Sequence, residues 1–499
     1  MFLPKNTFFL FILAFFLSFY GAFCQQITPQ TGSDHLGSIG VITNPASTLR
    51  SPMPWDVLVF GSRVNNLTNI ITVGKSDSSQ NLNSISINKG VAARKLNTSI
   101  NLNLFSASFK ASKKMSLSFG SNIRSYTRLL SSPFDYTDSL QIPDSFFYAN
   151  MQYQPLESKL LTSSWMELYG SVAINLVETE KYAINAGATL KVNRGLSGVF
   201  LNASDIRFAP LPPGGDIGYA VTAVDIDFGY SYTLEKWKSN QSASKNFSDL
   251  VKYAESGYSV DLGFEYIVKD RSDVSMYDDT PVKDYKWKFG LALLDLGYVK
   301  YKPGDLSLSS RGIKPTAQGF RLEEKFDQTV TTLKILTDSL KTVVNVFSTT
   351  VNNFNVYLPI RAIFNIDRRI SSLFYVNAFS SLNAASVLYG KKLFVTERNF
   401  LSITPRLENE SFGVYLPFTM YSNAEKRIGL AIKLGPLMAG FEDYSVFKPK
   451  NALENGLVYC SFRISPFKLF EKKTGAKADK DAFRTFDSRS NQSEDKNPL

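Results

Sequence analysis

Alternating apolar and polar side chains constrain the fold of this chain more than any other feature of its sequence. In TAVDIDFGYSY (Thr222–Tyr232), the even positions from Val224 onward are apolar or aromatic, and Asp225 and Asp227 fall between them. Alternation with a period of two is typical of a β-strand with one apolar and one polar face. About 14 segments share the pattern, and several run for about 10 to 14 residues. Strands of soluble proteins centre on about 5–6 residues, whereas a tilted membrane strand needs about 9–11.

The number and length of these segments predict an all-β fold, a transmembrane antiparallel β-barrel of about 14 strands. After the leader, no run approaches the roughly 18 consecutive apolar residues of a transmembrane helix. A membrane-spanning chain of this kind must therefore be a closed barrel. Tyrosine and tryptophan recur at segment ends, where a barrel carries its aromatic girdles, and connections of very different length separate the segments.

The two ends of the chain differ in composition from the segments between them. The first 24 residues hold Lys5, an apolar run from 8 to 20 and the small Ala22, which predicts a signal peptide over 1–24, cleaved after Cys24. Lipidation of Cys24 is the alternative, although Phe23 stands where a lipidation site needs a small residue. We expect the barrel over 55–467, and a charged, flexible tail over 468–499.

One interval departs from the alternation. Apolar residues recur every three or four positions from Leu322 to Phe347, which predicts an amphipathic helical insert at about 320–348. Such a helix packs on a barrel rim or within a loop; gating or binding of a partner is the alternative. A shorter helix is expected over 246–256.

The polar faces of the predicted strands carry both acidic and basic side chains. Asp225 and Asp227 are spaced closely enough for a pair of glycosidase carboxylates, which needs about 5–10 Å. However, lysines and an arginine occupy equivalent positions on sister strands, and mixed charge is typical of the water-facing side of a barrel. We therefore predict that these residues line the lumen, with catalysis or cargo selection as the alternatives: Glu167, Lys191, Asp225, Asp227, Asp261, Glu265, Lys286, Lys288 and Arg361.

The composition argues against most enzyme classes. His35 is the only histidine, so histidine-based metal or acid–base sites have almost no ligands available. No Gly-rich phosphate loop or nucleophile elbow stands out, and the net charge of +11 is scattered rather than gathered in a basic block. We expect no catalytic activity, no metal, no cofactor and no nucleic-acid partner.

Three short stretches resemble known families. In GSIGVITNPAS, the triplet Asn44-Pro45-Ala46 lies shortly before the first strand, and it resembles the N-terminal region of FadL/PorV-like outer-membrane barrels. The resemblance implies that residues 25–54 enter the barrel as a hatch. GATLKVNRGLSGVF (187–200), a strand followed by a Gly turn, and LALLDLGYVKY (291–301) resemble an uncharacterised group of such barrels from Bacteroidota.

The resemblance and the barrel pattern together predict a function in the bacterial outer membrane. We expect a passive conduit for small or hydrophobic molecules, embedded in outer-membrane lipid. The alternative is a structural component of a type IX-linked secretion or gliding machine, with secretion or gliding proteins as partners. A third alternative, an exported enzyme on a soluble β scaffold, has the weaker support of the carboxylate spacing alone.

Overall fold

The computed structural model describes residues 29–466, except 76–82, 138–142, 212–217, 271–284, 315–332, 351, 391, 423–424 and 444–456. The predicted signal peptide and the predicted C-terminal tail lie outside the described residues. Among the described helices, none is both long and apolar enough to cross a membrane.

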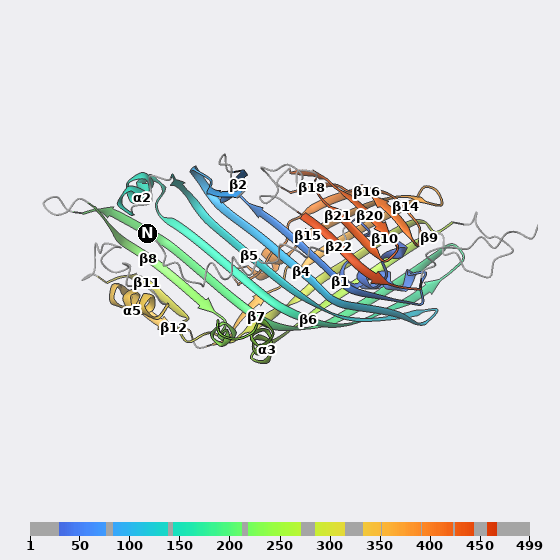
Figure 1. The fold of residues 1–499 in the computed structure, drawn as a ribbon, viewed down its shortest axis with the longest axis horizontal. Helices are drawn as coiled ribbons and strands as arrows, with labels where there is room; N and C mark the ends of the chain where they lie inside the picture. Colours follow the sequence, from blue (N-terminus) through green and yellow to red (C-terminus); the bar gives the residue numbers. More distant parts are fainter. Residues whose placement is uncertain are drawn as a thin grey trace, which may run out of the picture. The chain divides into compact units, whose positions relative to one another are not determined.

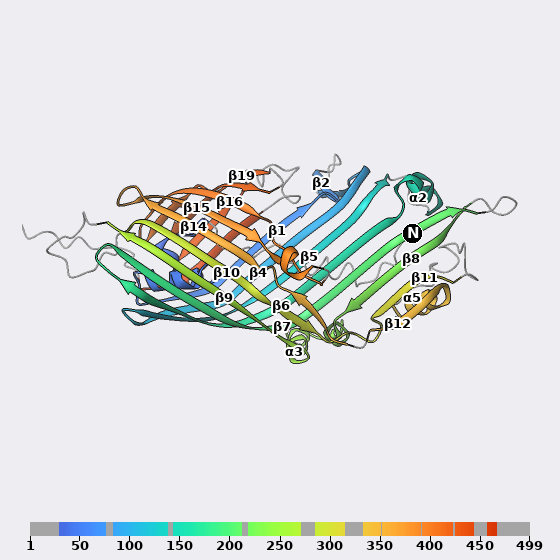
Figure 2. The same cartoon turned by 180° about the vertical axis from the view of Figure 1, so that it is seen from behind.

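Fourteen antiparallel strands close into a barrel (Figures 1 and 2), which confirms the predicted fold class. The ring closes at β1, which pairs with β4 on one side and with β22 on the other. Around the ring, the strands are β1 (Trp55–Thr68), β4 (Gly90–Ser112), β5 (Met115–Tyr136), β6 (Leu156–Glu178), β7 (Tyr182–Pro210), β9 (Ser256–Lys269), β10 (Tyr285–Tyr301), β14 (Arg361–Arg369), β15 (Phe374–Asn383), β16 (Phe400–Glu408), β17 (Phe412–Tyr415) with β18 (Phe418–Tyr421), β19 (Lys426–Ile428) with β20 (Leu430–Leu434), β21 (Leu437–Phe441) and β22 (Leu457–Ile464).

Two positions of the ring are each filled by a pair of short strands in line. β17 and β18 are separated by Leu416 and Pro417, and both pair with β16. Proline has no N–H to donate to a ladder, so Pro417 interrupts the strand without ending it. β19 then pairs with β18, and β20 pairs with β17.

The ring strands are apolar outside and polar inside. In β6, Leu168, Val172 and Ile174 are exposed, whereas Glu167 and Tyr169 on either side of Leu168 are buried. An outward apolar surface against a polar interior is the arrangement of a barrel surrounded by lipid. We call this outer surface the apolar belt; its exposed side chains include Leu168, Val172, Ile174, Leu190, Val192, Tyr258, Leu262, Phe264, Phe289, Leu291, Phe364, Ile366, Leu401, Ile403, Phe418, Met420, Ile432 and Leu434.

β7 is longer than the ring requires, and it changes partner along its length. Residues 182–194 pair with β9 within the ring, whereas residues 199–210 pair with β8 (Tyr219–Tyr230). β8 pairs in turn with β11 (Leu308–Ile313), and β11 pairs with β12 (Val344–Thr349). The Gly turn predicted within 187–200 is therefore wrong, because β7 continues through Gly195 and Gly198 to Pro210.

The second half of β7 belongs to a region outside the ring that has a conventional hydrophobic core. We call residues 195–210, β8, β11 and β12, together with helices α2 (Pro143–Asn150) and α5 (Leu333–Val343), the sheet extension (Figures 1 and 2). Its core consists of Phe147, Leu156, Phe208, Val221, Leu308, Leu340, Val343 and Val344. Val224, Ile226 and Phe228 of β8 pack against this core.

The predicted helical insert ends earlier than expected. α5 ends at Val343, and residues 344–349 form β12 instead, so the prediction of helix there is wrong. Val344 and Val346 are β-branched, and such residues fit the pleated surface of a strand better than a helix. Residues 315–332 of the insert lie outside the described residues. The predicted short helix is present as α3 (Ala243–Lys252).

The remaining described elements connect or cap the strands. They are η1 (Asp34–Ile42), η2 (Pro45–Arg50), the hairpin β2 (Ile71–Lys75) and β3 (Asn83–Ile87), η4 (Met151–Tyr153), η5 (Tyr232–Lys236), β13 (Phe354–Tyr357), which pairs with the end of β10, and α6 (Ala385–Tyr389).

Candidate functional site

The N-terminal segment 29–51, which we call the hatch, lies against the inner side of the barrel wall. Asn44 caps η2 by accepting a hydrogen bond from the Ala46 N–H at 3.0 Å, and Pro45 occupies the first helical position. Proline is favoured there because its missing N–H would have no helical partner. The Asn44 Nδ2 also donates to the Phe264 carbonyl oxygen of β9 at 3.1 Å. The Asn-Pro-Ala triplet thus both starts a helical turn and attaches that turn to the wall.

Two glycines of the wall let the hatch approach closely. Gly187 of β7 and Gly263 of β9 are direct partners across the ladder. A Cβ on Gly187 would lie 2.5 Å from the Ala46 nitrogen, and one on Gly263 would lie 2.9 Å from the Pro45 Cδ. Both distances are too short for a side chain, so the seat of the triplet requires glycine at these positions.

Buried ion pairs hold the hatch at its first helical turn. The Lys288 Nζ lies 2.8 Å from the Asp34 Oδ1, and Asp34 also pairs with Arg50 within the hatch. The Arg50 Nε lies 3.9 Å from Glu265 of the wall. The Ser33 Oγ donates to Glu408 at 2.8 Å. Separating the hatch from the wall would remove these partners from Lys288 and Glu265 of the wall, which is costly in a buried site.

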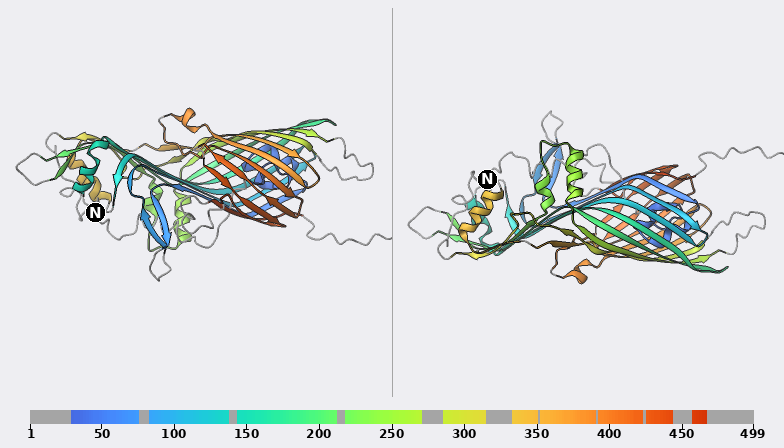
Figure 3. Two further views of the ribbon diagram at one scale, coloured as in Figure 1. Left: turned by 90° about the horizontal axis from the view of Figure 1, so that it is seen from above. Right: turned by 90° about the horizontal axis from the view of Figure 1, so that it is seen from below.

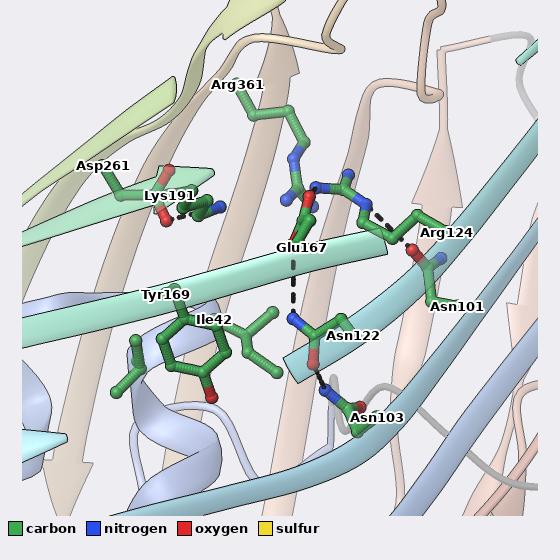
Figure 4. Close-up of a pocket in the computed structure, with 11 residues that line it drawn as sticks. Ile42, Asn101, Asn103, Asn122, Arg124, Glu167, Tyr169, Lys191, Asp261 and Arg361 are labelled. Atoms are coloured by element: carbon green, nitrogen blue, oxygen red, sulfur yellow. Dashed lines mark hydrogen bonds and ion pairs between the residues drawn. The ribbon is translucent and has the colours of Figure 1, made fainter. Parts of the chain in front are cut away.

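A second cluster of charges crosses the lumen beyond the hatch, and Asp295 is its centre (Figure 4 shows its neighbours). The Arg124 Nη1 and the Lys191 Nζ each lie 2.8 Å from the Asp295 Oδ1. The Arg361 Nη2 lies 3.0 Å from the other carboxylate oxygen. The three cations also contact Glu167, Asp261 and Glu397 at 2.7 to 2.9 Å. The cluster ties strands from both sides of the ring together.

Asp295 has an unusual backbone conformation. Its φ is 62°, and it lies in the register shift between Leu293 and Leu296 in the pairing of β10 with β9. The extra residue of a bulge turns a side chain away from the regular alternation. Asp and Asn are the non-glycine residues that best tolerate this left-handed conformation. The Asp295 N–H donates to the Asp261 Oδ1 at 2.7 Å, which fixes the bulge.

Two cavities adjoin the hatch. The first is bounded by Val41 and Ile42 of the hatch and by the charged cluster, and it also contacts Asn101, Asn103, Asn122 and Tyr169 (Figure 4). The second lies between other hatch residues, among them Asn44 and Arg50, and the wall residues Glu265 and Lys288. The hatch therefore borders each of these two cavities.

The charged groups of this cluster are paired with one another, and the carboxylates outnumber the cations by one. Three cations face four carboxylates: Arg124, Lys191 and Arg361 against Glu167, Asp261, Asp295 and Glu397. Within the part of the chain that the structure describes, no group of His, Cys, Asp and Glu side chains is arranged to hold a metal ion. The arrangement provides a polar wall and cross-links between strands.

Six of the nine predicted lumen residues lie buried on the inner side of the ring. Glu167, Lys191, Asp261 and Arg361 border the first cavity, and Glu265 and Lys288 border the second. Lys286 lies outside instead, because a register shift between Tyr285 and Trp287 turns Lys286 to the exposed side. This placement corrects the prediction for Lys286.

Asp225 and Asp227 also do not line the lumen, because β8 belongs to the sheet extension. The Asp227 carboxylate pairs with the Arg311 Nη2 at 2.7 Å and accepts from the Ser309 Oγ at 2.6 Å. Asp225 accepts from the Gly312 N–H at 2.8 Å. Partial burial alone would raise the pKa of Asp227, but hydrogen bonds from Ser309 and Arg311 hold that pKa below its usual value. These aspartates join β8 to β11.

Several residues of the cluster were not predicted from the sequence. Asp295 follows two leucines and so breaks the alternation in LALLDLGYVKY, which is a usable sign of a bulge. Arg124 occupies a polar-face position of β5, and the same argument that selected Lys191 would have selected it. Glu397 lies in a connection before β16, and alternation gives no signal there.

The chain has the fold of an outer-membrane β-barrel, and its N-terminal segment lies in the lumen. The model of the family described as "Family of unknown function (DUF5723)" matches residues 49–441, and the chain belongs to this family. No curated protein matches the sequence.

Solved structures of FadL-type barrels are similar over most of their length. A Pseudomonas aeruginosa FadL homologue is 7% identical with a TM-score of 0.41, over 89% of this chain and 98% of its own. The Ralstonia pickettii toluene transporter TbuX is 9% identical with a TM-score of 0.33, over 86% and 92%. The Pseudomonas putida toluene transporter TodX is 6% identical with a TM-score of 0.34, over 86% and 94%. Similarity at this level does not indicate what this chain transports.

Proposed function

We propose that this protein is an outer-membrane conduit for small molecules, and that the hatch holds it closed. The observation that carries the proposal is the seat of the hatch. A segment that borders the two cavities described above rests on the paired glycines Gly187 and Gly263, and it is fastened by the ion pairs of Asp34 with Lys288 and of Arg50 with Glu265. A wall shaped to receive a removable segment suits a passage better than a purely structural barrel.

The placement in the membrane follows from the apolar belt. Contiguous exposed apolar surface of this extent is unfavourable in water and marks contact with a partner or a membrane. In a closed barrel with a polar interior, lipid is the partner that satisfies every strand at once. Export by a cleaved signal peptide remains a prediction.

The interior suggests the chemistry of the cargo. The first cavity is bordered mainly by amides and charged groups, with Val41 and Ile42 as its aliphatic residues. An apolar solute would have to displace water from charged groups without replacing their hydrogen bonds, which is costly. We therefore favour small water-soluble or amphiphilic molecules over hydrocarbons. Uptake of xylose and of toluene by proteoliposomes would separate the two.

The glycine seat provides the test of the conduit. The double variant Gly187→Val/Gly263→Val should push the hatch off the wall and raise conductance in planar bilayers several-fold above the wild-type level. Removal of residues 25–51 should give the largest conductance. Gly170→Val is the matched control, because a Cβ on Gly170 meets nothing within 4 Å. Wild-type conductance in a correctly folded double variant, judged by heat-modifiable gel migration, would contradict the proposal.

Two further expectations from the sequence remain predictions. The alternative role, in a secretion or gliding machine, is tested by affinity purification in mild detergent. The similarity to PorV and to barrels of Bacteroidota also stays a prediction. The proposal assigns no catalytic step to the chain.

A further inference from the structure

A cluster of lysines and tyrosines is formed by the connection between β8 and β9 together with Lys302, which directly follows β10, and neither the hatch nor the lumen uses it. The Lys236 Nζ lies 4.1 Å from the centre of the Tyr232 ring, and the Lys302 Nζ lies 4.4 Å from the same ring. The Lys252 Nζ lies 5.4 Å from the Tyr253 ring, and the two rings are 6.5 Å apart. We call these five residues the basic–aromatic cluster.

Among the described residues, the lysines of this cluster contact aromatic rings. In the described part of the chain, Lys236, Lys252 and Lys302 make no salt bridge, and Lys252 and Lys302 are exposed. The ion pair within α3 joins Lys245 to Asp249 and involves none of these three lysines. Three cations held around two phenol rings form a surface that an anionic group would complement.

The cluster is rigidly placed because α3 is fastened to the barrel. The Arg194 Nη2 of β7 donates to the Val251 carbonyl oxygen at the end of α3 at 2.9 Å. The Asn246 side chain exchanges hydrogen bonds with both backbone groups of Lys238, at 2.9 and 3.0 Å. The opposite face of α3 leaves Phe247 40% exposed, and Tyr253 at its end is 42% exposed.

Strand register places the cluster at the edge of the apolar belt. Val192 of β7 pairs with Tyr258 of β9, and both are exposed members of the belt. Two pairs further toward α3, Arg194 pairs with Ser256, which lies three residues after Tyr253 of the cluster. Aromatic and basic residues at the edge of a lipid-facing surface are typical of the lipid–water boundary.

The same combination recurs at α6, which lies at the same end of the barrel and protrudes on the other side from α3 (Figure 3). Val387 and Leu388 of α6 are 85% and 57% exposed. The Lys392 Nζ just beyond lies 4.7 Å from the Tyr357 ring. Exposed apolar side chains next to a lysine on a tyrosine suit a boundary where apolar groups enter lipid and the ammonium reaches the head groups.

We propose that η5 and α3 form an interfacial anchor whose lysines bind the phosphate head groups of membrane lipids at this rim. The lipids belong to the outer leaflet, because the short turns, such as Lys113–Lys114 between β4 and β5, lie at the opposite end, and barrels have short periplasmic turns. The inference rests on the proposed membrane placement of the belt.

Lipid nanodiscs test the anchor. The wild type should unfold at a higher temperature in discs containing phosphatidylglycerol than in phosphatidylcholine discs. The variant Lys236→Gln/Lys252→Gln/Lys302→Gln should lose more than half of this gain, and the corresponding Lys→Arg triple should retain it. The control, Lys159→Gln/Lys334→Gln/Lys341→Gln, removes the same charge away from the cluster and should behave like the wild type.

The inference is overturned if the Gln triple keeps the full gain, or if inorganic phosphate added to phosphatidylcholine discs reproduces it. Spin labels separate this failure from a failure of the membrane placement. A label at Leu190→Cys should be accessible to oxygen within lipid, and one at Ser248→Cys should lie at head-group depth, both on a Cys460→Ser background. If the label at position 190 lies within lipid but the label at position 248 is fully exposed to water, the anchor is rejected and the membrane placement of the belt is retained.

Discussion

The ring and the sheet extension are built partly from the same long strand, β7, yet they distribute their side chains in opposite ways. In the ring, Leu190 of β7 is 69% exposed and Lys191 is buried among carboxylates. In the extension, Phe208 of β7 is 2% exposed within an apolar core, and the charges of Asp227 and Arg311 lie near the surface. Alternation gives a strand two different faces, but what surrounds the strand decides which face is buried.

The largest expected difference concerns one aspartate from each region. Asp295→Asn keeps the left-handed backbone but leaves three buried cations short of a carboxylate, and removal of one partner from a buried pair costs about 3–5 kcal/mol. Asp227→Asn breaks a partly exposed pair, which is worth about 0–1 kcal/mol. Guanidinium unfolding in detergent micelles would measure both. Equal losses in the two variants would show that the lumen network is solvated like a surface.

A comparison of two apolar residues of β7 sharpens the contrast. Phe208→Ala should destabilise the extension by about 3–5 kcal/mol, because it removes a buried aromatic ring from the core. Leu190→Ala should cost less than Phe208→Ala, because the site faces lipid that fills the vacated space, so that only the transfer part of the loss remains and no cavity forms. Hydrogen exchange of the amides of β8 and β7 would locate each effect. A large loss from Leu190→Ala would mean that the belt packs against protein.

The smallest expected effect is a pH dependence confined to the extension. Because the pKa of Asp227 is lower in the folded protein, its contribution to stability is present above the unfolded pKa of about 3.9 and is lost as the pH falls through the folded value. Protection of the amides in the pairing of β8 with β11 against hydrogen exchange should therefore fall below about pH 4. The dependence should be weaker in Asp227→Asn, and an unchanged profile would show that the pair with Arg311 contributes nothing.

Much of the site could be read from alternation, and the exceptions have identifiable causes. Glu167, Lys191, Asp261, Glu265, Lys288 and Arg361 occupy regular polar-face positions, and the structure buries them inside the ring. Lys286 and Asp295 lie next to register shifts, which reverse or interrupt the alternation without changing residue types. Pairing between strands distant in sequence decides where such a shift falls.

The sequence by itself determined that this chain forms long amphipathic strands and that about 14 such segments exist, because side-chain periodicity is a local property. It also marked Asn44, Pro45 and Ala46, which the structure seats on Gly187 and Gly263. Only the tertiary structure decided which strands close the ring. TAVDIDFGYSY has the periodicity of a barrel strand, yet β7 has already exchanged β9 for β8 when it meets this segment. The alternation is the same in both regions. Whether the apolar face of a strand contacts lipid or a protein core depends on its neighbouring strands, which the local sequence does not determine.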